Sequence, residues 1–100
     1  MEIEWNSEAE KEFLQLPKNI QREVKSCIEK LPEKGLNWDK VEYIGREDLD
    51  LEVFRLKINS EEVNHRVIFD VKDQKYIIYK VGRRPGFYEK ESLSEVENRI

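Results

Sequence analysis

Residues 51–81 read LEVFRLKINSEEVNHRVIFDVKDQKYIIYKV, and this stretch decides the fold of the chain. Three segments rich in Val, Ile, Phe and Tyr, at residues 51–58, 63–71 and 76–81, are separated by polar residues at 59–62 and 72–75. Short segments of this composition predict β-strands, and tight polar turns between them predict antiparallel pairing. The stretch therefore predicts an antiparallel meander with one covered face.

The N-terminal part of the chain predicts a short strand followed by two helices. Residues 1–5 alternate between apolar and acidic side chains, which is the pattern of a half-buried strand. Ser7 and Glu10 form a capping-box pair that predicts the start of a helix, and Pro17 ends it. A second helix is expected from Lys18, because apolar residues recur on one helical stripe: Ile20, Val24, Cys27, Ile28 and Leu31.

Two further segments complete the predicted architecture. Residues 41–44 predict one more strand, and the tail from Ser92 predicts a short helix with Leu93, Val96 and Ile100 on one side. We therefore expect a single α+β domain spanning residues 1–100. An N-terminal strand and an α-helical hairpin pack on a four- to five-stranded, mostly antiparallel sheet, with a short C-terminal helix.

The composition excludes several classes of protein. Cys27 is the only cysteine, so the chain forms no intramolecular disulfide and no cysteine-rich metal site, and a small core residue is expected there. No apolar segment approaches the roughly 20 residues of a membrane helix. The acidic N-terminus lacks the pattern of a signal peptide. We expect a cytoplasmic protein that does not bind a membrane.

Charge is distributed unevenly along the chain, whose net charge at pH 7 is −4. Residues 1–52 contain 8 Lys and Arg against 14 Asp and Glu, whereas residues 53–90 contain 9 against 5. A basic region within an acidic chain indicates a surface that faces a polyanion. The meander and the loop after it are therefore the expected place for a nucleic-acid site.

Alternation along the strands assigns side chains to the two faces of the sheet. From residue 54 to 58 the even-numbered apolar residues favour the core beneath the helices, so Arg55 and Lys57 point the opposite way. On the next strand, Arg66 points away from the core-facing His65, which is expected to be a packed residue and not a catalyst. Antiparallel pairing can bring Arg55, Lys57 and Arg66 together on the uncovered face, as an anion-binding site or as a solvated polar surface.

The loop at residues 80–88 reads KVGRRPGFY and combines basic and aromatic side chains. Arginine recognises phosphate through two parallel hydrogen bonds, and an aromatic ring offers a base a stacking surface. The loop therefore predicts RNA contacts from Lys80, Arg83 and Phe87. The alternative is that Phe87 and Tyr88 only dock the C-terminal helix.

Four motifs occur in a characteristic order along the chain. Leu16-Pro17 separates the two helices, VFRLKI forms a strand at 53–58, HRVIF forms the next at 65–69, and VGRR at 81–84 precedes a tyrosine. This order closely resembles the RelE/ParE toxin superfamily over essentially the full length of the chain. The resemblance implies a RelE-like fold. For the RelE branch it implies cleavage of mRNA in the ribosomal A site, without a metal or other cofactor, by attack of the ribose 2′-hydroxyl on the adjacent phosphate.

The resemblance also implies five catalytic residues in this chain: Arg55, Lys57, Arg66, Arg84 and Tyr88. Preorganised cations stabilise the charge that develops on a phosphate, which is the expected role of Arg66 and Arg55. A lysine can take a proton where burial or neighbouring cations favour its neutral form, so Lys57 is the candidate general base. Arg84 is expected near the leaving 5′-oxygen, and Tyr88 is expected to stack on a base or share in proton transfer.

Three functions are open from the sequence. The first is a ribosome-dependent endoribonuclease toxin, monomeric when free and hetero-oligomeric with an antitoxin that masks its basic face. The second is a ParE-like inhibitor of DNA gyrase, and the third is a catalytically weak or inactive binding homologue. Many family members have a histidine where this chain has Arg83, which keeps the third open. The strand-face cations favour the endoribonuclease, because the gyrase inhibitors tend to lack them.

Overall fold

The computed structural model describes residues 2–46, 51–60, 63–83 and 90–100. Within these residues the chain forms a five-stranded sheet in the order β1-β5-β4-β3-β2, together with helices. The elements in chain order are β1 (Glu2–Trp5), α1 (Ser7–Leu14), α2 (Lys18–Glu29), α3 (Leu31–Lys34), β2 (Val41–Arg46), β3 (Leu51–Asn59), β4 (Asn64–Lys72), β5 (Lys75–Arg83) and α4 (Lys90–Arg99).

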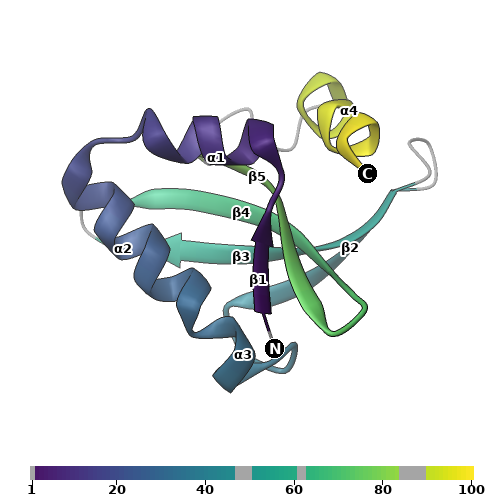
Figure 1. Cartoon of the computed structure of the whole chain (residues 1–100), viewed down its shortest axis with the longest axis horizontal. Coiled ribbons are helices and arrows are strands. Elements are labelled where there is room, and N and C mark those ends of the chain that lie inside the picture. The colour runs from purple at the N-terminus through teal and green to yellow at the C-terminus, as the bar shows by residue number, and fades with distance from the viewer. Residues whose placement is uncertain (1, 47–50, 61–62, 84–89) are drawn as a thin grey trace.

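Strands β2 to β5 form the antiparallel meander that the sequence predicts, and β1 extends the sheet beside β5 (Figure 1). β1 runs parallel to β5, with Ile3 opposite Tyr76. The predicted mostly antiparallel sheet is therefore confirmed. The turn between β4 and β5 is tight, because Asp73 and Gln74 adopt left-handed φ angles of 52° and 62°, as a two-residue hairpin of this hand requires.

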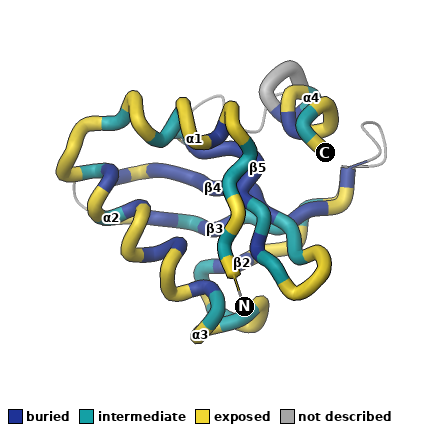
Figure 2. The backbone as a smooth tube through the Cα atoms, viewed as in Figure 1, coloured by how far each residue is buried: buried dark blue, intermediate teal, exposed yellow. Residues whose placement is uncertain are grey.

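The helical hairpin covers one face of the sheet and buries the main core against it (Figure 1). Buried positions are concentrated along β3, β4 and β5, as Figure 2 shows. Trp5 and Trp38 pack half-buried at the edge of this core. Most of the predicted helical stripe and of the even-numbered apolar residues of β3 belongs to this core, whereas Ile20 and Phe54 are partly buried against it. The buried members are Ala9, Val24, Cys27, Ile28, Leu31, Val41, Leu56, Ile58, Val63, Val67, Phe69, Tyr76, Ile78 and Val81.

The helices differ from the prediction at their ends. Asn6, not Ser7, caps α1, because its side-chain oxygen accepts hydrogen bonds from the backbone N–H groups of the next turn at 2.9 and 3.3 Å. α4 begins at Lys90, so Ser92 lies within the helix and not at its start, where the sequence predicts it. Ile100 is 53% exposed, which corrects the expectation that it joins the apolar side of α4. None of the helices in the described ranges is long and apolar enough to cross a membrane.

α4 covers part of the second face of the sheet, which the sequence analysis expected to be open. Leu93 and Val96 of α4 pack in a second buried cluster with strand residues whose side chains point away from the main core: Leu51, Val53, Ile68 and Tyr79. The prediction of a single covered face is therefore wrong at this end of the sheet. Apolar residues at alternate positions of β3 and β4 supply the second contact surface.

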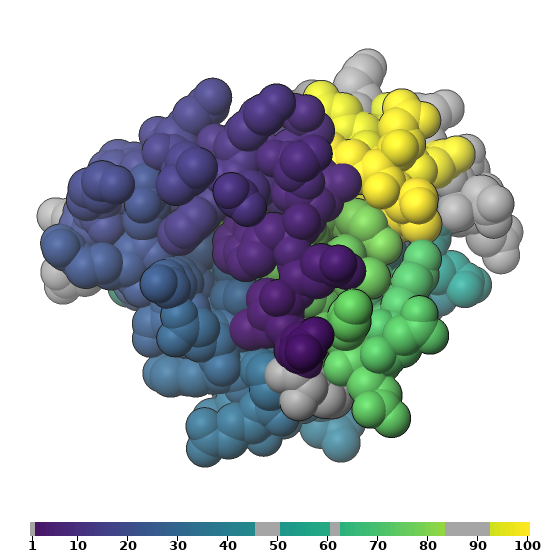
Figure 3. All heavy atoms as spheres, in the orientation of Figure 1, coloured from purple at the N-terminus to yellow at the C-terminus, as the bar shows by residue number. Residues whose placement is uncertain are grey.

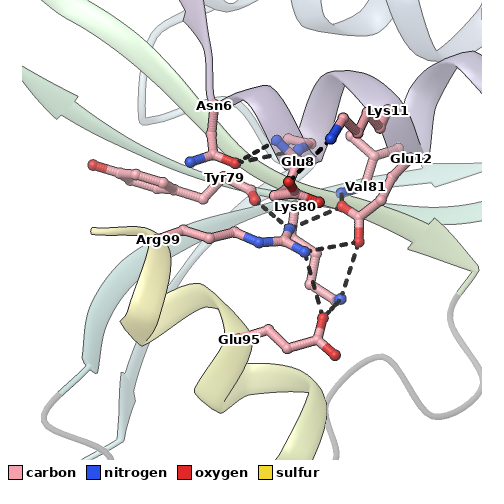
Figure 4. Close-up of polar contacts among 10 residues, drawn as sticks. Asn6, Glu8, Lys11, Glu12, Tyr79, Lys80, Val81, Glu95 and Arg99 are labelled. Carbon is pink, nitrogen blue, oxygen red and sulfur yellow. Dashed lines mark hydrogen bonds and ion pairs between the residues drawn. The ribbon is translucent and has the colours of Figure 1, made fainter.

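An ion-pair network joins α1, β5 and α4, and Figure 4 shows its members converging between the three elements. Glu12 of α1 pairs with Lys80 of β5 at 3.4 Å and with Arg99 of α4 at 3.0 Å. Glu95 of α4 pairs with Lys80 at 2.9 Å, and Arg99 donates a hydrogen bond to the carbonyl oxygen of Tyr79 at 2.7 Å. In the space-filling view, α4 lies directly against α1 (Figure 3). The network therefore fixes the C-terminal helix to the first helix.

We expect Glu12→Gln to lower the free energy of unfolding by about 1–3 kcal/mol, because it removes one carboxylate from two nearly buried cations. Glutamine keeps the size of the side chain and can still accept the hydrogen bond from the backbone N–H of Val81. Urea denaturation followed by circular dichroism measures the change. Glu10→Gln, on an exposed position of α1, is the control and should stay within about 0.5 kcal/mol of the unaltered chain. Equal stability of the two variants would contradict the network's role.

Candidate functional site

The β3–β4 hairpin places three cationic side chains on the second face of the sheet, beyond the part that α4 covers. Lys57 lies directly opposite Arg66 in the antiparallel register, and Arg55 lies opposite Ile68. Directly opposed side chains share a face, with their Cβ atoms about 5 Å apart. The prediction that these three cations share one face is therefore confirmed. We call Arg55, Lys57 and Arg66 the cation cluster.

Arg66 is the most buried member of the cation cluster, with 5% of its surface exposed. Its Nη1 donates hydrogen bonds to Asn59 Oδ1 at 2.9 Å, to the carbonyl oxygen of His65 at 2.9 Å and to Asn64 Oδ1 at 3.3 Å. Asn59 and Asn64 are opposed in the register where β3 and β4 meet. The hairpin itself therefore orients the guanidinium, using neutral acceptors.

Arg66 has no counter-charge within the described parts of the chain. No described carboxylate lies within ion-pairing distance of its guanidinium, and its Nε is buried without a hydrogen-bond partner. A guanidinium stays charged when buried, and a buried charge without an opposite charge is costly in free energy. The surroundings of Arg66 therefore favour the binding of an anion.

Glu42 on β2 faces the other two cations from the neighbouring strand. It lies opposite Arg55 in the register, and its carboxylate pairs with the Arg55 guanidinium and with the Lys57 ammonium, the latter at 3.0 Å. Hydrogen bonds from Lys57 and from Arg55 hold the pKa of the Glu42 carboxyl below its ordinary value, so it is ionised at neutral pH. All three side chains are partly exposed, at 45% for Glu42 and 28% and 29% for Arg55 and Lys57. A ligand in solution can therefore reach this ion pair.

A β-bulge on β5 determines the face of the sheet to which Lys80 and Arg83 point. The register with β4 shifts by one residue at Tyr79. Lys80 is 7% exposed and belongs to the ion-pair network with α1 and α4, so we leave it out of the proposed RNA contacts. Arg83 is exposed, lies opposite His65, and follows Val81 of the main core by two residues. Arg83 is therefore on the helix-covered side of the sheet, away from the cation cluster.

A groove of about 380 Å³ lies on the helix side of the molecule, between β1, α1 and α2. Its described lining is mainly apolar, and none of it belongs to the cation cluster: Ile3, Trp5, Glu10, Phe13, Leu14, Lys25, Ile28 and Glu29. Recognition of a phosphate requires convergent donors or cations. Among these lining residues the one cation is Lys25, which pairs with Glu29 at 3.8 Å. The cation cluster is therefore the stronger candidate for a functional site.

No family model and no curated protein matches this chain, whereas several solved structures do. A mutant of the E. coli toxin RelE in the free state superposes with a TM-score of 0.65 at 19% identity, over 99% of this chain and 96% of that one. A chain of the archaeal RelE–RelB complex from Pyrococcus horikoshii gives 0.63 at 23% identity, over 83% and 93%. The intact E. coli RelBE toxin–antitoxin complex gives 0.62 at 18% identity, over 82% and 94%. The chain has the RelE fold.

The RelE fold implied by the sequence motifs is thus present, and in this chain its β3–β4 hairpin carries the cation cluster. The remaining predicted site residues belong to the segment after β5. Arg84, Phe87 and Tyr88 lie outside the described residues, so their roles stay predictions.

His65 lies on the helix-covered face of the hairpin that carries the cation cluster in this RelE fold. It is 2% exposed, and its Nδ1 has no hydrogen-bond partner among the described residues. Burial lowers the pKa of His65, and the nearby charges of Arg83 and Arg66 lower it further. His65 is therefore a neutral packed residue at pH 7, as the sequence pattern predicted.

We expect stability to fall as the pH drops below about 6.5, the ordinary pKa of histidine. The unfolded chain takes up a proton at His65 near that pH, whereas the folded chain takes it up only at lower pH, so protonation favours unfolding. Thermal unfolding at about pH 7.5 and about pH 5.5 measures the loss. The lowered pKa values of Glu42 and Glu95 act only below about pH 4.5 and do not overlap. His65→Leu should reduce the loss, and an equal loss in both proteins would assign it to other groups.

Proposed function

We propose that this chain is the toxin of a toxin–antitoxin module and an endoribonuclease that cleaves mRNA in the ribosomal A site, without a metal. Two kinds of observation support the proposal. The chain has the fold of RelE toxins over 99% of its length, and that fold carries a cation cluster on the open part of its sheet. We also propose that the protein is soluble and acts in the cytoplasm.

The observation that carries the proposal is that the buried charge of Arg66 has no counter-charge among the described residues. Its guanidinium is buried, is oriented by two asparagines, and has no carboxylate partner among the described residues. Lys57 lies directly opposite it and is partly exposed. A phosphodiester bound beside this pair would supply the missing negative charge, and its oxygens match the donor geometry of arginine.

The proposed reaction is attack of a ribose 2′-oxygen on the adjacent phosphorus. The new bond joins the 2′-oxygen to phosphorus, and the bond to the 5′-oxygen breaks, which leaves a 2′,3′-cyclic phosphate and a 5′-hydroxyl. Lys57 is the candidate to take the proton of the 2′-hydroxyl, a role that requires its neutral amine, released from the ion pair with Glu42. Arg66 and Arg55 stabilise the additional negative charge on the phosphorane, and this stabilisation acts mainly in the transition state.

The leaving 5′-oxygen requires a proton, and Arg84 and Tyr88 are proposed to act there. A guanidinium releases its proton reluctantly, so Arg84 is expected to act mainly through its charge. Tyr88 can donate a proton through its hydroxyl group or stack on a base with its ring. Phe87 and Arg83 are proposed to contact the RNA outside the reacting phosphate.

The proposed protein partner is an antitoxin. Two of the similar solved structures are complexes of RelE with RelB. An antitoxin that covers the cation cluster would keep the chain from its RNA substrate. The free chain is proposed to be monomeric and to form a hetero-oligomer with the antitoxin.

Toe-printing of translating ribosomes with the purified chain tests the proposed activity. We expect cleavage opposite the A site by the unaltered chain, and a rate reduced about 100-fold or more by Lys57→Ala or Arg66→Ala, because each removes a group that acts on the reacting phosphate. Lys72→Ala is the matched control, since Lys72 is exposed at the far end of β4. It should leave the rate unchanged.

Arg66→Lys separates loss of charge from loss of fold, because it keeps a cation at the buried position but cannot form the two parallel contacts of a guanidinium. Circular dichroism confirms the fold of each variant. Cleavage by Arg66→Ala at the unaltered rate would remove the assignment of Arg66. Absence of cleavage by the unaltered chain, combined with inhibition of supercoiling by DNA gyrase, would replace the proposed function with the gyrase-inhibitor function.

A further inference from the structure

Glu42 places a negative charge directly beside the cation cluster. One carboxylate oxygen accepts a hydrogen bond from Lys57 Nζ at 3.0 Å, and the other pairs with the Arg55 guanidinium. The Glu42 carboxylate therefore reaches two of the three cations of the cluster. Arg66, on the far side of Lys57, has only neutral acceptors among the residues that the structure describes.

Carboxylate and phosphate oxygens compete for the same donors. Both accept parallel hydrogen bonds from a guanidinium and charge-assisted hydrogen bonds from an ammonium. Glu42 thus makes the contacts with Arg55 and Lys57 that a substrate phosphate would need. Its partly exposed position allows the side chain to leave the cations when a ligand approaches.

We infer that Glu42 is a specificity-determining residue that competes with the substrate phosphate for Arg55 and Lys57 and leaves Arg66 as the first phosphate contact. The inference rests on the proposed function and identifies what controls the affinity of that site. RNA binds first through Arg66, and Arg55 and Lys57 join only when Glu42 is displaced. An RNA strand held in place by other contacts displaces Glu42 more readily than a strand that encounters the site alone.

The competition persists over the whole neutral range of pH. The pKa of the Glu42 carboxyl is lowered by its hydrogen bonds with Lys57 and Arg55, so the side chain is an anion throughout this range, as the substrate phosphodiester is. Neutralising Glu42 by substitution is therefore the direct way to remove the competitor.

Glu42→Gln tests the inference with a gain of binding, which partial unfolding would not produce. The probe is a fluorescent single-stranded 2′-O-methyl oligoribonucleotide, which keeps its phosphates but lacks the attacking hydroxyl, and anisotropy gives its dissociation constant. Glu52→Gln is the charge-matched control. Glu52 is exposed on β3 between Leu51 and Val53 of the second cluster, so alternation places it on the opposite face from Glu42.

We expect Glu42→Gln to bind the probe about fivefold more tightly than Glu52→Gln. The slope of log affinity against log salt should also become steeper, by about 0.7 for each cation that gains a phosphate contact. Equal affinities of the two variants, or weaker binding by Glu42→Gln, would overturn the inference. Weaker binding would mean that Glu42 holds Arg55 and Lys57 in position for the phosphate.

Arg66→Ala distinguishes failure of this inference from failure of the proposed function. If Arg66→Ala weakens binding while Glu42→Gln equals Glu52→Gln, the phosphate site stands and the competing role of Glu42 is wrong. If Arg66→Ala binds the probe as tightly as the unaltered chain, or if none of the proteins binds it, the phosphate site itself is wrong and the inference falls with it.

Discussion

The antiparallel register between β3 and β4 determines both the core and the cation cluster. Successive strand residues point to opposite faces, so a slip of one residue would turn Leu56 and Ile58 to the open face and place Arg55 and Lys57 beneath the helices. Each buried leucine or isoleucine contributes about 1.5–3 kcal/mol, and a buried unpaired cation costs several more. The apolar residues on one face therefore fix the position of the cations on the other.

The strands and the shared face of the cation cluster were predictable from the sequence because alternation is a local property. The same alternation places the apolar residues Leu51, Val53 and Ile68 on the second face, which is the sequence signal for the cover that α4 provides. The ion pairing of Glu42 with the cation cluster was not predictable from alternation. Its contact with Arg55 depends on the register of β2 against β3, which the short segment at 41–44 does not determine.

The placement of Lys80 shows a second limit of sequence reasoning. The β-bulge at Tyr79 and the approach of Glu12 from α1 are tertiary features. Together they make Lys80, which the sequence predicts in a basic loop, a buried strand residue of an ion-pair network. The acidic character of the chain is also explained at this level. Glu12, Glu95 and Glu42 neutralise particular cations, whereas Arg66 has no such partner among the described residues. The net charge of the chain therefore does not predict the local electrostatic potential at the cation cluster.

The parallel pairing of β1 with β5 affects the order in which parts of the fold can form. Ile3 lies opposite Tyr76 in the strand register, and Arg99 donates a hydrogen bond to Glu12, from which it is separated by 87 residues in sequence. Contacts of such long range form late, because the intervening chain must be ordered first. During synthesis, β1 can pair only after β5 has emerged from the ribosome, and α1 can contact α4 only after α4 has emerged. The pairing of β1 with β5 and the contact between α1 and α4 are thus expected to be among the last parts of the fold to form.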